Sequence, residues 1–232
     1  MSALSYIDEN LNAVRREIAE AESRAERVGA TRMLAAVKYG ESAEIEALLV
    51  QGVCGVGENR VQQLLEHWPT LERYGAEVHF IGSLQTNKVK YIADKVSMIH
   101  SVDSLRLAAE IDKQCGKLQR RMDVLVEING AREEAKSGVM PEEVEALCRE
   151  ILRMPWLRLC GFMTMGPRLE DESAYVSYFR SVKEIGDGVW HALALSGEPL
   201  YSMGMSESFG AAIAAGAHMV RVGRRLFYKS NT

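Results

Sequence analysis

The feature that most constrains the fold is a regular alternation of short apolar runs with longer amphipathic segments, which begins after Gly29. The apolar runs predict eight strands, at 32–37, 53–56, 78–81, 96–100, 122–128, 158–162, 200–203 and 218–222. The intervening segments predict helices at 42–51, 58–67, 84–93, 104–118, 141–152, 171–186 and 206–215, with a short one after 224. Such strict alternation is typical of parallel strands joined by helical crossovers.

Eight strand–helix units predict an α/β fold in which the sheet closes into a single (β/α)8 TIM barrel. Such a barrel takes about 250 residues, and the chain has 232, so we expect one domain over residues 1–232. A doubly wound open sheet is the alternative. It is disfavoured because its glycine fingerprint is missing: in GVGENR at 55–60, Arg60 stands where the third glycine is required.

Residues 1–28 predict a long amphipathic helix that packs on the barrel. Its apolar side chains recur every three or four positions, at Leu4, Ile7, Leu11, Val14, Ile18, Ala21 and Ala25. Two later helices have start signals. Asp103 is the expected N-cap of one, because its carboxylate can accept free backbone N–H groups. Pro141 begins the other, at a position where a missing N–H has no cost.

Composition and charge exclude several classes of protein. The chain has 28 Lys+Arg and 32 Asp+Glu, a net charge of −4, whereas a nucleic-acid binder needs a basic face. The four cysteines, at 54, 115, 148 and 160, have no zinc-ligand or CxxC spacing, so we expect reduced thiols and no metal. The sequence contains neither a signal-peptide pattern nor an apolar run that could span a membrane. We therefore expect a cytoplasmic protein and, since no strongly apolar surface patch can be recognised, a monomer.

Functional side chains of a barrel come from the C-terminal ends of its strands and the loops that follow. Lys38 stands at the end of the first apolar run. A lysine at an apolar mouth is desolvated, which lowers the pKa of its amine and makes it a nucleophile for a carbonyl group. A lysine that simply reaches solvent at a strand end is the simpler explanation of this position taken alone.

The last two strands are followed by a predicted anion site. Ser206 stands at the start of an expected helix, where an N-cap has free backbone donors, and Gly223 with Arg224 begins the short terminal helix. In barrels, the loops after the seventh and eighth strands often bind phosphate. Arg221, in the final strand, can point into the same mouth, and a barrel-filling salt bridge is the alternative for it.

Several motifs in series resemble one known family, the pyridoxal phosphate homeostasis proteins (YggS/PROSC-like). The match runs from about Met33 to Phe227, and the motifs are AAVKYGES, GVGENRVQQL, HFIGSLQTNKVK, IHSVDSL, VLVEING, KSG, GFMTM, SMGMSES and AAIAAGAHMVRVGRRLF. The resemblance implies a barrel similar to the N-terminal domain of bacterial alanine racemase, with pyridoxal 5′-phosphate (PLP) bound as an internal aldimine. The family's lysine matches Lys38. The phosphate would be held by Ser206 and by the backbone N–H groups of Gly223 and Arg224.

Two further residues would contact the ring of the cofactor, according to the same resemblance. Arg221 in VRVG would face the pyridine nitrogen, and Asn59 in GENR would lie on the cofactor's other side. An arginine stays charged and cannot accept the proton of the ring nitrogen. The ring nitrogen would then be neutral, and the cofactor would support carbanion chemistry only weakly.

These expectations favour a PLP carrier that stores the cofactor and delivers it to apo forms of PLP-dependent enzymes, without catalytic turnover. The alternative is a PLP-dependent enzyme similar to an amino-acid racemase. The resemblance to alanine racemase implies a second base, a tyrosine on an extra β-domain, and a barrel of this length leaves no residues for that domain. A third hypothesis is an unrelated phosphate ligand, with Lys38 as an electrostatic contact.

Overall fold

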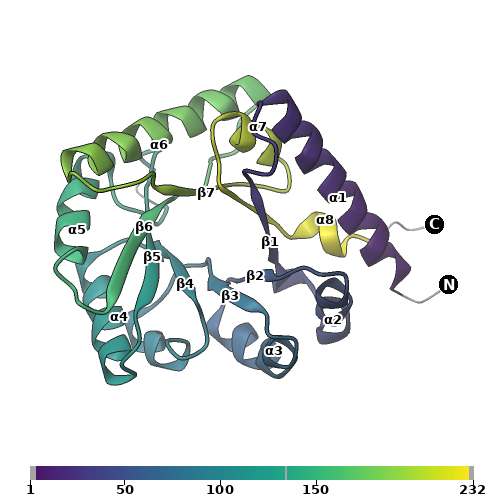
Figure 1. Ribbon diagram of the computed structural model, residues 1–232, viewed down its shortest axis with the longest axis horizontal. Helices are drawn as coiled ribbons and strands as arrows, with labels where there is room; N and C mark the ends of the chain where they lie inside the picture. Colours follow the sequence, from purple (N-terminus) through teal and green to yellow (C-terminus); the bar gives the residue numbers. More distant parts are fainter. Residues whose placement is uncertain (1–3, 134, 230–232) are drawn as a thin grey trace.

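The computed structural model describes residues 4–133 and 135–229, and its centre is a closed barrel of eight parallel strands (Figure 1). Each strand pairs with the next in chain order, and β8 pairs with β1. The strands are β1 (Arg32–Ala36), β2 (Gly55–Glu58), β3 (Glu77–Phe80), β4 (Met98–Val102), β5 (Met122–Glu127), β6 (Leu157–Met163), β7 (Leu200–Met205) and β8 (Met219–Val222). The predicted barrel is confirmed, and the β1–β8 pairing excludes the open sheet.

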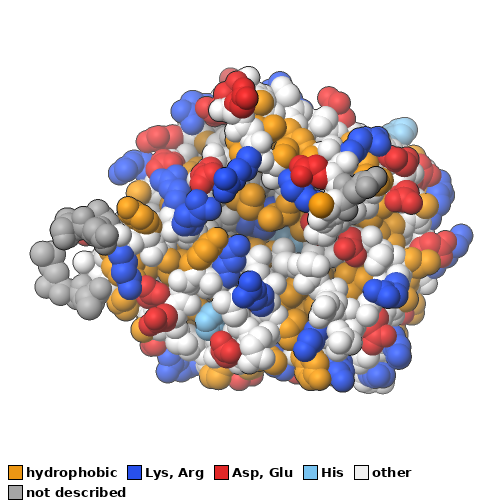
Figure 2. Space-filling view, turned by 180° about the vertical axis from the view of Figure 1, so that it is seen from behind, with side chains coloured by type: hydrophobic (Ala, Val, Ile, Leu, Met, Phe, Trp, Pro, Cys, Tyr) orange, Lys and Arg blue, Asp and Glu red, His pale blue; other side chains and the backbone are white. Residues whose placement is uncertain are grey.

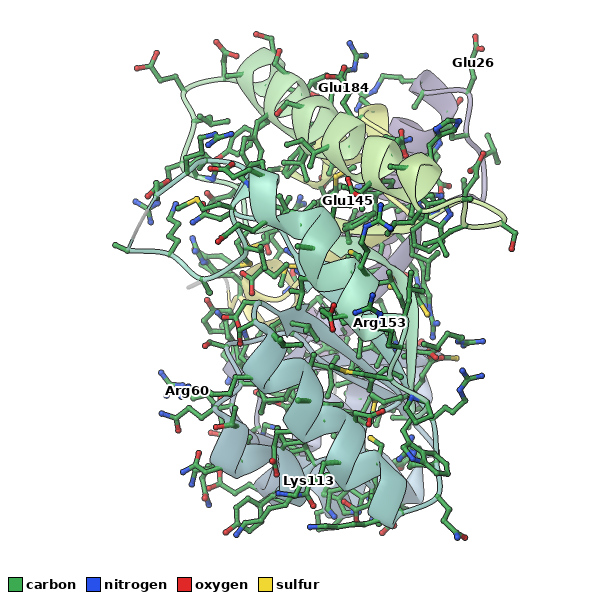
Figure 3. The ribbon with its side chains drawn as sticks, turned by 90° about the vertical axis from the view of Figure 1, so that its left-hand side faces the viewer. Glu26, Arg60, Lys113, Glu145, Arg153 and Glu184 are labelled. Atoms are coloured by element: carbon green, nitrogen blue, oxygen red, sulfur yellow. The ribbon has the colours of Figure 1, made fainter. Side chains whose placement is uncertain are left out.

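Helices surround the barrel and connect its strands (Figure 1). The α-helices are α1 (Ser5–Arg24), α2 (Ser42–Val50), α3 (Val61–Arg73), α4 (Leu105–Lys117), α5 (Val144–Ile151), α6 (Glu172–Ala192), α7 (Phe209–Ala214) and α8 (Arg224–Phe227). The short 3-10 helices are η1 (Val37–Tyr39), η2 (Thr86–Tyr91) and η3 (Pro141–Glu143). Figure 3 shows the outer side of α4, α5 and α6, where Lys113, Glu145 and Glu184 point away from the barrel, as expected for amphipathic helices.

The crossover between β3 and β4 differs from the prediction. The segment 84–93 was expected to be an α-helix, but its central part is the 3-10 helix η2. Thr86 and Val89 are β-branched, and the side chain of Asn87 competes for backbone hydrogen bonds, so all three disfavour an α-helix. Each of the other crossovers contains an α-helix, as predicted.

Of the two helix starts predicted from the sequence, the structure agrees with one and differs from the other. Asp103 is not the N-cap of α4, because Ser104 lies directly before the first helical residue, and its hydroxyl accepts a hydrogen bond from the N–H of Leu107. The predicted cap was therefore wrong by one residue. Pro141 begins η3, which leads directly into α5, as expected.

The helix α1 packs against α2, α7 and α8 on the outside of the barrel (Figure 1). Ile7, Leu11 and Val14 of its apolar stripe are almost fully buried. Arg225 of α8 forms an ion pair with Glu17 of α1, which fixes the two helices side by side. The predicted N-terminal helix is confirmed over Ser5–Arg24, but it ends before residues 25–28, which were also expected to be helical, and residues 1–3 lie outside the described residues.

The core has two parts. The larger part lies between the barrel and the helices and includes fully buried side chains such as Phe80 and Phe162. The interior of the barrel contains two smaller apolar clusters, one formed by Leu34, Ala36 and Ile81 and the other by Met98, Leu125, Met163 and Met219. It also contains a set of buried polar side chains: His79, His100, Glu127, Ser202 and Arg221. Buried polar groups need partners, so these residues are candidates for a role beyond packing.

The carboxyl ends of the strands form the mouth of the barrel. In Figure 3, Arg60, which follows β2, lies at the left side, and Glu26, which precedes β1, lies at the right. The mouth faces the viewer in Figure 2, where Lys and Arg side chains gather around the middle of the face. No helix among residues 4–133 and 135–229 is long and apolar enough to cross a membrane. The same residues contain no group of His, Cys, Asp and Glu that could hold a metal ion.

Candidate functional site

An open cavity of about 830 Å³ lies at the mouth of the barrel. Residues at the ends of β1, β2, β7 and β8 line it, together with the loop after β6. The lining includes all the site residues expected from the sequence, namely Lys38, Asn59, Ser206, Arg221, Gly223 and Arg224. Barrel closure thus brings together residues from both ends of the chain.

Lys38 lies on η1, directly after β1, and its side chain is exposed. Its Nζ atom is 4.9 Å from the centre of the Tyr39 ring. The next residue, Gly40, lets η1 lie against α8, because a Cβ there would come within 2.3 Å of the Phe227 ring. Of the two explanations that the sequence left open for Lys38, a desolvated amine and a side chain that reaches solvent at a strand end, the exposure agrees with the second, because η1 turns the chain outward as soon as β1 ends. The amine is open to a ligand in the cavity.

Ser206 lies in the turn between β7 and α7, and not at the N-cap of α7 as predicted. Ser208 is the N-cap, because two hydrogen bonds close the turn before the helix begins. The N–H of Ser208 donates to the carbonyl of Met205 over 2.9 Å, and the N–H of Met205 donates to Ser208 Oγ over 3.2 Å. The hydroxyl of Ser206 faces β8 instead and accepts a long hydrogen bond, 3.4 Å, from the N–H of Gly223.

The end of β8 lies unusually close to β1. A Cβ at Gly223 would be 2.8 Å from the carbonyl oxygen of Ala36, so only glycine fits without a shift of the backbone. Arg224 follows as the first residue of α8. Its side chain forms an exposed ion pair with Glu207, with 2.8 Å between the charged atoms. The backbone N–H groups of Gly223 and Arg224 are therefore the donors that this segment offers to the cavity.

Arg221 lies at the inner end of the cavity and is only 3% exposed. Its Nη1 donates to the carbonyl oxygen and to the hydroxyl of Ser202, each over 2.7 Å, and its Nη2 donates to the carbonyl oxygen of Thr164 over 2.8 Å. Oxygen atoms of neutral groups hold the guanidinium, in place of the salt bridge considered from the sequence. Burial lowers the pKa of Arg221 to about 10, so the side chain stays charged at neutral pH.

Asn59 follows β2, and its Oδ1 atom is buried with no hydrogen-bond partner among the described residues. The loops after β2 and β3 are in direct contact here, since a Cβ at Gly82 would lie 2.2 Å from the carbonyl oxygen of Asn59. A buried amide oxygen without a donor costs free energy. Asn59 is therefore a candidate to accept a hydrogen bond from a ligand.

Several residues near the cavity are not among those predicted from the sequence. Met165 and Arg168 in the loop after β6, and Tyr175 on α6, line it. The rule that barrel sites lie after strand ends could have found the loop residues.

Glu127, at the end of β5, was also not predicted, and it is only 3% exposed. Burial raises the pKa of Glu127 to about 7, Asp103 acts in the same direction, and Arg221 opposes both.

Comparisons with known proteins agree with this fold and this site. The family model described as alanine racemase, N-terminal domain, matches residues 10–230. A protein of Aquifex aeolicus named pyridoxal phosphate homeostasis protein is 44% identical over 177 residues, which cover 75% of this chain and 77% of that protein. The protein of that name from Escherichia coli is 34% identical over 235 residues, which cover 97% of this chain and 97% of that protein.

A solved structure extends the comparison to three dimensions. PipY of Synechococcus elongatus, with PLP bound, is 26% identical and superposes with a TM-score of 0.79, covering 91% of this chain and 100% of PipY. The match of the family model spans nearly the whole barrel. The chain therefore belongs to the pyridoxal phosphate homeostasis protein family, whose barrel is the alanine racemase N-terminal domain.

Proposed function

We propose that this protein binds PLP in the mouth cavity and holds it for storage and delivery, without catalytic turnover. The observation that carries the proposal is the lining of that cavity, which combines the exposed amine of Lys38 with hydroxyl and backbone donors at the ends of β7 and β8. A ligand with an aldehyde and a phosphate needs both kinds of group. The PLP bound to PipY and the names of the relatives support this choice of ligand.

The phosphate end of the ligand fits the junction of β7 and β8. Hydroxyl and backbone N–H groups are common donors to phosphate oxygens. Ser206 and Gly223 share only one long hydrogen bond of 3.4 Å, so little is lost when both turn toward an anion. The N–H of Arg224 is the third donor, and glycine at 223 keeps side-chain atoms out of the space between β8 and β1.

The aldehyde end fits Lys38. When bound, PLP supplies a carbonyl group that condenses reversibly with a primary amine. Lys38 would hold the ligand covalently through its amine, and its exposed position on η1 leaves that link open to water and to competing amines. An accessible covalent bond between Lys38 and PLP favours release of the PLP, and a delivery protein requires such release.

The ring of the ligand would lie between Arg221 and Asn59. Arg221 would donate to the ring nitrogen, and Asn59 would offer its unpaired Oδ1 to the ring hydroxyl. With a pKa of about 10, Arg221 stays a donor and leaves the ring nitrogen without a proton. A neutral ring nitrogen withdraws few electrons, so these residues bind and orient the ligand without activating it for racemisation.

The test is to fix the ligand where it is bound. Purified protein loaded with PLP is reduced with borohydride and digested, and the modified peptide is identified by mass spectrometry. We expect a pyridoxyl group on Lys38, a yellow wild type and a colourless Lys38→Ala variant. Lys88→Ala, which changes an exposed lysine of η2, is the control and stays yellow.

Two results would refute the proposal in different ways. A wild type that fixes no pyridoxyl group on Lys38 would leave only the unrelated phosphate ligand. Turnover of alanine or serine, with exchange of the Cα hydrogen in deuterated water, would show that the protein is the racemase-like enzyme and not a carrier.

We further propose that apo forms of PLP-dependent enzymes receive the cofactor, and that the protein is a cytoplasmic monomer made of one domain over residues 1–232.

A further inference from the structure

A continuous series of hydrogen bonds runs inside the barrel from the cavity to the opposite end. Ser202 on β7, His100 on β4 and His79 on β3 connect Arg221 with Glu77, and all three connecting residues are 0% exposed. The four distances are 2.7 Å (Arg221 Nη1 to Ser202 Oγ), 2.9 Å (Ser202 Oγ to His100 Nδ1), 2.8 Å (His100 Nε2 to His79 Nδ1) and 2.8 Å (His79 Nε2 to Glu77 Oε1). We name these five residues the interior network.

The two end residues of the interior network can each act in only one way: Arg221 only donates hydrogen bonds, and Glu77 only accepts them. Arg221 has donors only. Glu77 is the first residue of β3, at the end of the barrel opposite the mouth, and the guanidinium of Arg32 holds its pKa at about 2, so the carboxylate only accepts. Burial lowers the pKa of His79 and lowers that of His100 further, so both rings are neutral at neutral pH. A neutral imidazole donates from one nitrogen and accepts at the other.

The direction of every hydrogen bond follows from Glu77. Because Glu77 accepts, His79 donates from Nε2 and must accept at Nδ1. His100 then donates from Nε2 and accepts at Nδ1, so the hydroxyl of Ser202 donates to it. The lone pairs of the Ser202 oxygen are left for Arg221, which donates to them. The carboxylate of Glu77, at one end of the barrel, therefore determines that the Ser202 hydroxyl donates to His100 and accepts from Arg221 at the other end.

We propose that Glu77 is a positioning residue for the cavity, because the direction it gives to the interior network holds Arg221 in place as the donor that faces the ligand. The terminal nitrogens of Arg221 donate to Ser202, to Thr164 and weakly to the sulfur of Met165. Its Nε–H has no partner in the described part of the chain, so it is the donor left for a ring nitrogen. This last step rests on the proposed function, whereas the interior network belongs to the protein without ligand.

Without Glu77 the opposite direction becomes available. The amide of Glu77→Gln can donate as well as accept, so His79 can accept at Nε2 and donate from Nδ1. His100 would then donate to Ser202 from Nδ1. The Ser202 oxygen would receive two donors, and its own hydrogen would lose its acceptor. To find another acceptor the hydroxyl would have to rotate, which would change the geometry of the oxygen that Arg221 contacts.

The first experiment uses ¹⁵N NMR of the protein without PLP. We expect His79 and His100 to be neutral between pH 7 and 8, with the proton on Nε2 in both rings. Glu77→Gln should populate the Nδ1–H form of both rings and shift the Arg221 Nε–H resonance. Arg32→Gln is the matched control, because it breaks the same ion pair but keeps the carboxylate, and it should keep the wild-type tautomers. An Nδ1–H histidine in the wild type, or unchanged tautomers in Glu77→Gln, would overturn the proposal.

The second experiment measures the ligand. We expect Glu77→Gln to shift the visible absorption maximum of bound PLP and to weaken PLP binding about fivefold, while Arg32→Gln changes neither. If the tautomers change but the Arg221 resonance, the spectrum and the affinity do not, the interior network does not position Arg221. If the wild type fixes no PLP on Lys38, the proposed function fails, and the tautomers and the Arg221 resonance still decide the role of Glu77.

Discussion

Replacing Glu127 by glutamine should stabilise the protein at high pH and change its stability little at low pH. Burial raises the pKa of Glu127 from 4.5 to about 7. The unfolded chain loses this proton near pH 4.5, whereas the folded chain keeps it until about pH 7. Between these values the folded state binds more protons, so its stability falls as the pH rises. Below pH 4.5 the carboxyl is protonated in both states, and the penalty is absent.

The size of the effect follows from the change in pKa. One pKa unit corresponds to about 1.4 kcal/mol, so the full penalty above pH 7 is about 3 kcal/mol. The amide of Glu127→Gln has the same shape and no charge, which removes the cost of burying the carboxylate. Allowing for hydrogen bonds that the amide makes less well, we expect a gain of roughly 2 kcal/mol at pH 8. At pH 5 the gain should be below about 1 kcal/mol.

Urea unfolding followed by circular dichroism at pH 5 and pH 8 measures both values. Glu184→Gln, on the exposed side of α6 (Figure 3), is the control and should show no such dependence on pH. If Glu127→Gln is less stable than the wild type at pH 8, attraction to Arg221 outweighs the cost of burial. Burial of the ionised Glu127 would then not destabilise the folded protein.

Two further substitutions test the geometry. Gly223→Ala places a Cβ 2.8 Å from the carbonyl oxygen of Ala36, so we expect a loss of about 1–3 kcal/mol in urea unfolding and weaker PLP binding in an absorbance titration. Gly188→Ala, which meets no atom within 4 Å, is its control, and equal PLP binding by both variants would contradict the close approach. Ser104→Ala removes the N-cap of α4 and should cost about 1 kcal/mol. A larger loss for Asp103→Ala would contradict the observed cap.

The strands could be predicted because each has an outward face that packs against helices. That face gives every strand a run of apolar residues, whatever lies on its inner side. The inner side could not be interpreted in the same way. His79 and Ser202 alternate with apolar neighbours, a pattern equally typical of a strand with one face in solvent. Only closure of the barrel, which depends on all eight strands together, puts these polar residues in the interior.

The positions of the site residues could also be predicted, but not their local conformations. Lys38, Ser206 and Gly223 follow strand ends, and the mouth of a barrel collects such residues. Whether Lys38 is buried depends on the turn of η1, and where α7 starts depends on two hydrogen bonds between Met205 and Ser208. Contacts of this kind leave no periodic signal in the sequence.

The proposed function assigns recognition of the ligand and its covalent attachment to different parts of the cavity. Arg221 is fixed by hydrogen bonds to neutral oxygens, so its charge is present before any ligand arrives and needs no rearrangement. Lys38 lies on a short exposed helix outside the barrel interior. An aldehyde held on Lys38 as proposed would therefore be able to leave for another amine while the interior stays unchanged. A rigid recognition site with an accessible covalent attachment point agrees with the proposal that the protein transfers PLP and does not use it in catalysis.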